Sequence, residues 1–191
     1  MTLFFALFFS PLFLLFSILA AAAVHEAGHL LLLSHFGVKV ERLRLSAFGA
    51  EIDAPGAVRL SYAKELAVTL GGVGANILCA LFSAAAATYF SLPYFYVLAG
   101  ANAVTAVYNL LPVSPLDGGR ALYLVTAYFL GPAAGDAVSA AVGLLTASAL
   151  MLLGAHISLS MGEGCFFALA ALFIFLGTIR QLGLAKDGRK V

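Results

Sequence analysis

Five long apolar stretches constrain this chain more than any other feature. They run from Leu3 to Leu33, Leu66 to Phe90, Tyr94 to Leu111, Ala137 to Ala155 and Cys165 to Leu182. A helix needs about 20 apolar residues to cross a hydrocarbon core about 30 Å thick. Only 10% of the 191 residues are charged, against about 25% in soluble domains, so a water-soluble globule is excluded. We predict an all-α polytopic membrane protein with about five transmembrane helices.

Two of these apolar regions do not fit a simple span. The first run is longer than a bilayer requires, so it must tilt, protrude or break near Ser10 and Pro11. A shorter apolar piece, Ala121 to Leu130, follows a Pro/Gly-rich break and is too short to cross alone. We therefore expect it to form a short broken or interfacial helix.

The polar segment Gly37 to Glu65 separates the first two spans. Its part Val40 to Ile52 alternates loosely between apolar and polar residues, which indicates a small strand or hairpin element beside the membrane. We expect a membrane-embedded domain over residues 1–183 and a short basic tail over 184–191, with no regulatory nucleotide-binding domain.

The positive charges indicate the orientation of the chain. With five spans, all ten Lys and Arg residues fall on one side of the membrane, which the positive-inside rule assigns to the cytoplasm. We therefore predict a multi-pass protein of a bacterial cell membrane, with its N-terminus outside and its C-terminus cytoplasmic. The net charge of +1 gives no reason to expect a nucleic-acid partner.

The first span carries three ionisable side chains in the pattern HExxH: His25, Glu26 and His29. Ionisable groups inside a membrane are expensive and usually functional. Two histidines four residues apart on a helix share one face and can bind one metal ion, while Glu26 can act as the base that activates a water molecule. The alternative is a set of polar groups that only bond to one another inside a bundle.

A catalytic zinc site needs a third protein ligand. Glu51 and Asp53 belong to a solvated loop, Glu163 falls on the opposite side of the predicted topology, and Asp136 is expected to cap a helix start. Asp117 stands between Pro and Gly residues at the cytoplasmic end of a span, where irregular backbone is tolerated only around a protein-lined cavity. It is therefore the favoured third ligand, although an aspartate before glycine is also typical of a simple turn.

These two motifs together resemble the site-2 protease family of intramembrane zinc metalloproteases. HEAGH in one span and NLLPVSPLDGG, residues 109–119, in a later one carry the resemblance, and the sporulation type that cleaves a pro-sigma factor is the most similar branch. The resemblance implies one Zn²⁺ held by His25, His29 and Asp117, with Glu26 as the catalytic base. It also implies that Asn109 helps to shape the turn that holds the aspartate.

The resemblance extends to residues that would contact substrate. The segment GGVGAN, residues 71–76, looks like a small-residue motif of the family that ends in asparagine, here Asn76. The segment with Phe48, Gly49 and Ala50 is similar to its edge strand beside the membrane. We therefore expect substrate contacts at these four residues and at Asn109.

The predicted activity is hydrolysis of a membrane-spanning or membrane-associated substrate near the cytoplasmic face. Lipid and inhibitory membrane proteins are the expected partners besides substrate. The alternative is a metal-binding transporter or adaptor without catalysis. Such a protein would not need a glutamate at the second position of the motif.

Overall fold

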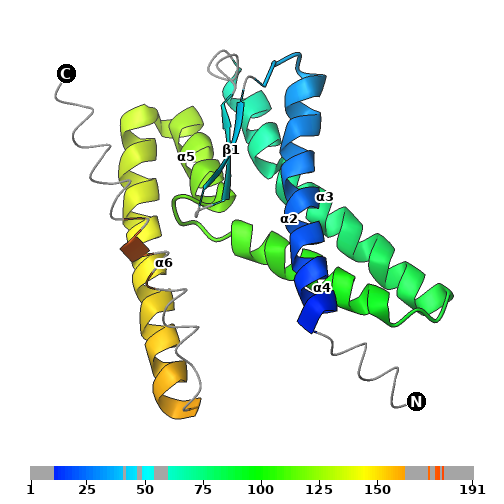
Figure 1. Cartoon of the computed structure of the whole chain (residues 1–191). Coiled ribbons are helices and arrows are strands. Elements are labelled where there is room, and N and C mark those ends of the chain that lie inside the picture. The colour runs from blue at the N-terminus through cyan, green and yellow to red at the C-terminus, as the bar shows by residue number, and fades with distance from the viewer. Residues whose placement is uncertain are drawn as a thin grey trace. The chain divides into compact units, whose positions relative to one another are not determined.

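The computed structural model describes residues 11–40, 42–46, 49–53 and 60–161, together with residues 172, 175, 176 and 178. Its helices and strands, labelled in Figure 1, are α2 (Pro11–His35), β1 (Arg42–Ser46), β2 (Gly49–Asp53), α3 (Tyr62–Tyr89), α4 (Tyr94–Asn109), α5 (Asp117–Leu130) and α6 (Pro132–Met161). The chain divides between Asn109 and Leu110 into two compact units. The first contains α2 to α4 with the two strands, and the second contains α5 and α6.

Among the described residues, three helices are long and apolar enough to cross a membrane: Leu12–His35, Tyr62–Tyr89 and Pro132–Ser160. The predicted span from Tyr94 to Leu111 corresponds to α4, whose 16 residues reach about 24 Å at 1.5 Å per residue, less than the hydrocarbon core. The predicted span from Cys165 to Leu182 lies almost wholly outside the described residues. The three long apolar helices identify the chain as a helical membrane protein.

Glycine and proline set several helix boundaries. After α2, Gly37 has a φ of 72°, and the N–H of Val38 donates to the carbonyl of Leu33 at 2.9 Å, which is the bond pattern of a Schellman end. Gly131, with a φ of 90°, ends α5, and Pro132 begins α6. Asp136 therefore lies inside α6, and the prediction that it caps the helix start is wrong, because the proline moves that start four residues earlier.

The second unit packs α5 against α6. The apolar piece predicted from Ala121 is longer in the structure, because α5 begins at Asp117. Val113 and Ala147 are fully buried at the centre of this unit, and Leu111, Leu150 and Phe175 pack around them.

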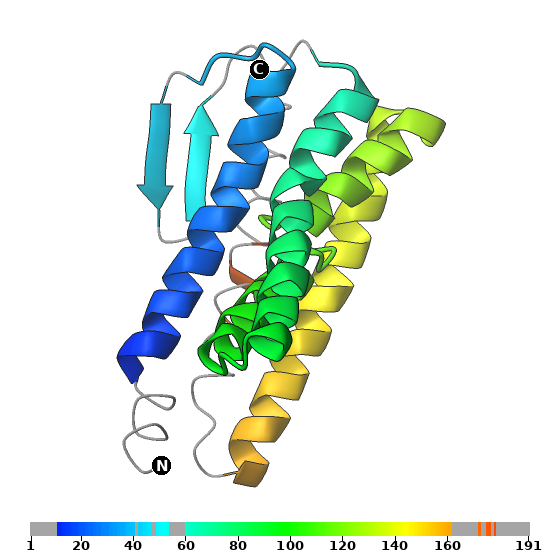
Figure 2. The ribbon, with the colours of Figure 1, turned by 90° about the vertical axis from the view of Figure 1, so that its right-hand side faces the viewer.

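In the first unit α2, α3 and α4 pack against one another (Figure 2). The backbones of α2 and α3 approach closely where Gly28 faces Gly71. A Cβ added to Gly71 would lie 2.8 Å from the carbonyl oxygen of Gly28, and one added to Gly28 would collide with the carbonyl oxygen of Gly71. Only glycine at both positions allows this contact.

Between α2 and α3 along the chain, β1 and β2 form an antiparallel pair with Arg42 opposite Asp53 and Ser46 opposite Gly49. This pair overlaps the segment Val40 to Ile52, for which the sequence predicts a strand or hairpin, and extends one residue beyond it to Asp53.

Polar and apolar side chains are distributed as expected for a lipid solvent. Large apolar side chains such as Leu12, Phe82 and Phe129 are 73–76% exposed. Asn76 and Asn102 are fully buried. Buried polar side chains such as these find their partners inside the protein, away from hydrocarbon, where an unpaired polar group is costly.

Candidate metal centre

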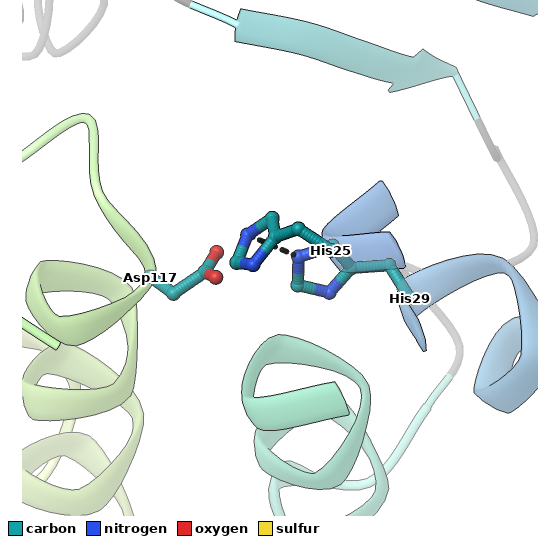
Figure 3. A group of neighbouring side chains, drawn as sticks. All are labelled: His25, His29 and Asp117. Atoms are coloured by element: carbon teal, nitrogen blue, oxygen red, sulfur yellow. Dashed lines mark hydrogen bonds between the residues drawn. The ribbon is translucent and has the colours of Figure 1, made fainter. Parts of the chain in front are cut away.

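His25 and His29 lie on one face of α2 with their rings in contact (Figure 3). Both side chains are buried, and their Nε2 atoms are 3.2 Å apart. The helical spacing of four residues produces this pairing, because residues i and i+4 are stacked on the same face. The structure therefore brings together the two histidines that the HExxH pattern predicts to act as a pair.

The other nitrogen of each ring has a partner on α3. The Nδ1 of His29 is 2.8 Å from the carbonyl oxygen of Val68, which can only accept, so this Nδ1 carries the proton. The Nδ1 of His25 is 2.8 Å from Oδ1 of Asn76. The amide nitrogen of Asn76 already donates elsewhere, so its oxygen accepts from His25. In the neutral tautomers both Nε2 atoms then present lone pairs toward each other.

This arrangement fits two ligands of a single cation. Ligand nitrogens at 2.0–2.1 Å from a tetrahedral zinc ion lie about 3.3–3.4 Å apart, close to the separation of 3.2 Å between the two Nε2 atoms. Ligand histidines also usually donate their second ring N–H to a carbonyl or a similar acceptor, which fixes the tautomer. The spacing of the two Nε2 atoms and the bonds made by the two Nδ1 atoms involve only residues of α2 and α3.

Gly72 on α3 provides the space that the two rings occupy. A Cβ at this position would lie 2.5 Å from Nε2 of His29 and 2.7 Å from Cε1 of His25. Such separations are shorter than real Cβ atoms show. The absence of a side chain at Gly72 is therefore a requirement for the histidine pair.

Asp117 is the first residue of α5 in the second unit (Figure 3). The two glycines that follow it allow the preceding loop to lie directly on the first turn of the helix. A Cβ at Gly118 would collide with the carbonyl group of Leu110, and one at Gly119 would lie 2.7 Å from the carbonyl carbon of Val113. The LDGG sequence thus holds the aspartate at a tightly packed helix start.

The remaining predicted site residues are placed as follows. Glu26 follows His25 on α2 and is half-buried. Asn109 is the last residue of α4, and its amide nitrogen donates to the carbonyl of Thr105 at 3.0 Å. Gly49 and Ala50 lie on β2, and Phe48 lies outside the described residues.

Asn76 is fully buried, and its amide group bonds to three groups. Its oxygen faces His25, and its nitrogen donates to the carbonyl of Ala21 and to Oδ1 of Asn102, each at 2.8 Å. These contacts place Asn76 beneath His25, as a residue that orients the ring. Its predicted contact with substrate stays a prediction.

Asn102 and the carbonyl of Val68 were missed by the sequence analysis. The signal for Asn102 was available, since an asparagine within an apolar stretch needs a partner. No sequence signal marks Val68, because the contacting atom belongs to the backbone.

A buried pair of imidazoles on apolar helices is an arrangement that suits a metal ion within a membrane, and the proteins that the chain resembles include zinc metalloproteases. No family model matches the chain. It is 28% identical over 181 residues to zinc metalloprotease MJ0392 of Methanocaldococcus jannaschii, covering 92% of this chain and 50% of the relative. It is 32% identical over 173 residues to the putative zinc metalloprotease Rip3 of Mycobacterium tuberculosis, covering 83% of this chain and 43% of the relative.

The fold is also similar to that of a solved structure, the site-2 protease from Methanocaldococcus jannaschii. The TM-score is 0.67 at 22% sequence identity, over 88% of this chain and 76% of that one. The chain spans about half the length of the curated relatives it matches. The chain therefore has the fold of a site-2 protease and is similar in sequence to relatives that are named zinc metalloproteases.

Proposed function

We propose that this protein is a zinc metalloprotease that hydrolyses peptide bonds within or beside the membrane. One observation carries the proposal: two buried imidazoles on an apolar helix have their Nε2 atoms 3.2 Å apart, with each Nδ1 bonded to an acceptor. The relatives named as zinc metalloproteases support it. Zinc acts in such sites as a Lewis acid that polarises a carbonyl group and lowers the pKa of water.

The proposed ligands are His25, His29 and Asp117. Two nitrogens and one carboxylate oxygen form a common ligand set of catalytic zinc, and three protein ligands leave one position open. His25 and His29 are preorganised by their bonds to Asn76 and Val68.

Glu26 is the proposed general base. It takes a proton from the attacking water and returns it to the leaving amine, a role that suits a carboxylate beside the metal ligands. A metal transporter or adaptor would have no need of this group, and no described contact favours that alternative.

The proposed substrate is a membrane-spanning or membrane-associated segment that unwinds near the site. Unpaired peptide groups are costly in hydrocarbon, so an exposed strand edge is a suitable acceptor for an extended chain. The residues Phe48, Gly49 and Ala50 are proposed to provide this edge, and Asn109 a further contact. A pro-sigma factor of the sporulation type is the substrate that the motif resemblance suggests.

The proposed orientation has the N-terminus outside and the active site toward the cytoplasm, since all ten Lys and Arg residues fall on one side of a five-span topology.

The direct test is metal-dependent cleavage. Purified protein in detergent is incubated with a panel of membrane-tethered candidate substrates, with and without 1,10-phenanthroline. We expect cleavage to stop with the chelator and to return when zinc is added back. Cleavage that continues after all zinc has been removed would exclude the proposal.

A further inference from the structure

Three helices of the first unit are joined by one chain of buried amide hydrogen bonds that ends at a candidate metal ligand. Asn102 on α4 accepts from Nδ2 of Asn76 on α3 at 2.8 Å, and Oδ1 of Asn76 faces Nδ1 of His25 on α2 at 2.8 Å. Asn76 and Asn102 are both fully buried. Buried polar groups such as these destabilise the fold unless every donor and acceptor among them has a hydrogen-bond partner.

The direction of this chain matters for His25. An asparagine amide can be turned so that either its oxygen or its nitrogen faces a neighbour. If the nitrogen of Asn76 faced His25, the ring would carry its proton on Nε2 and could not bind a metal through that atom. The orientation of Asn76 therefore selects the tautomer of the ligand.

The orientation of Asn76 is itself set by two acceptors. Its nitrogen donates to the carbonyl oxygen of Ala21 and to Oδ1 of Asn102, at 2.8 Å each. Asn102 in turn is fixed because its own nitrogen donates to the carbonyl of Leu98 at 2.9 Å. A backbone carbonyl can only accept, so the Leu98 carbonyl determines which way the amide of Asn102 points.

We infer that Asn102 is a positioning residue which acts through Asn76 to hold His25 in the metal-binding tautomer. This inference rests on the proposed zinc site. Asn102 contacts neither histidine in the described hydrogen bonds, so its effect passes entirely through the amide of Asn76.

The test compares substitutions at Asn102 by their zinc affinity, measured by competition with a chromophoric chelator in detergent. Asn102→Leu keeps the approximate size but removes the acceptor, and we expect about tenfold weaker zinc binding, the lower end of the loss seen when partners of ligand histidines are removed. Asn102→Asp keeps an acceptor at the Oδ1 position but loses the donor to the Leu98 carbonyl, and we expect it to weaken zinc binding less than Asn102→Leu does.

Thr105→Val is the matched control on α4. Among the residues that the structure describes, its hydroxyl donates to the carbonyl of Ala101, four residues earlier and 2.8 Å away. This substitution removes a polar group from the same helix without touching the chain of amides. We expect unchanged zinc affinity.

A double-mutant cycle separates positioning from general stability. In an Asn76→Leu background the route to His25 is already broken, so Asn102→Leu should cause no further loss of zinc affinity. The visible spectrum of the cobalt-substituted protein should change with Asn102→Leu and not with Thr105→Val. If Asn102→Leu does not accumulate in the membrane, Asn102→Ser, which is smaller and keeps a hydroxyl too short to reach Asn76, serves in its place.

The inference is overturned if Asn102→Leu binds zinc as tightly as the parent. It is also overturned if Asn102→Leu weakens zinc binding equally in the parent and in the Asn76→Leu background. Either result would leave the proposed function standing. Failure of the parent protein to bind zinc would overturn the proposed function and this inference with it.

Discussion

Replacing Gly72 by alanine adds one carbon atom at the place where the two imidazoles lie. The new Cβ would be 2.5 Å from Nε2 of His29, about 0.9 Å closer than the 3.4 Å at which ordinary contact begins. The rings cannot simply swing aside, because each Nδ1 is bonded to α3 at 2.8 Å. Either these bonds break or α2 and α3 separate.

Ligand distances in metal sites vary by only about 0.2 Å, so a displacement of this size is several times the tolerance. We expect Gly72→Ala to bind zinc about 10–100-fold more weakly, equivalent to about 1.4–2.8 kcal/mol. The assay is competition with a chromophoric chelator of known affinity, with zinc content checked by atomic absorption.

Gly74→Ala is the control, two residues along the same helix. Within the part of the chain that the structure describes, nothing lies within 4 Å of a Cβ at Gly74. Both substitutions improve helix propensity by about 1 kcal/mol, so a difference between them reports the contact with the histidines. Equal zinc affinity in Gly72→Ala and the parent would refute the claim that the rings are held against this glycine.

Three further predictions concern packing, topology and substrate. Gly28→Ala should destabilise the protein by about 1–3 kcal/mol in thermal unfolding in detergent, because its Cβ meets the backbone of α3; Gly100→Ala, with no described atom within 4 Å, should not, and equal stabilities would contradict the packing argument. In a background without the native cysteines, a cysteine at Ser91 should react with an impermeant thiol reagent outside intact cells and one at Ser61 should not, whereas the reverse labelling would invert the topology. Ala50→Pro removes a backbone donor from β2 and should slow cleavage strongly at normal zinc content, while parental activity would remove the role of the strand edge.

The sequence predicted the histidine pair well, because its geometry is local. The i, i+4 spacing on a helix places His25 and His29 together whatever the rest of the chain does. The ends of helices were predicted less well. Pro132 was not used as a helix start, although proline suits that position, and Asp136 was consequently taken as a cap.

The groups that orient the histidines depend on tertiary packing. The bond from His29 reaches a residue 39 positions away and that from His25 a residue 51 positions away. No periodicity encodes which backbone carbonyl will face a ring once α2 and α3 pack through Gly28 and Gly71. The need for a bare glycine at Gly72 likewise follows only from the position of the rings.

The central claim is that Glu26 acts as the base beside a zinc ion, and Glu26→Gln tests it most directly. Glutamine keeps the shape of the side chain and cannot take up a proton, so the variant should bind one zinc ion per chain as the parent does. Loss of a general base costs about 100–10,000-fold in rate, and we predict a fall in substrate cleavage within that range. Cleavage at the parental rate by zinc-loaded Glu26→Gln would contradict the account.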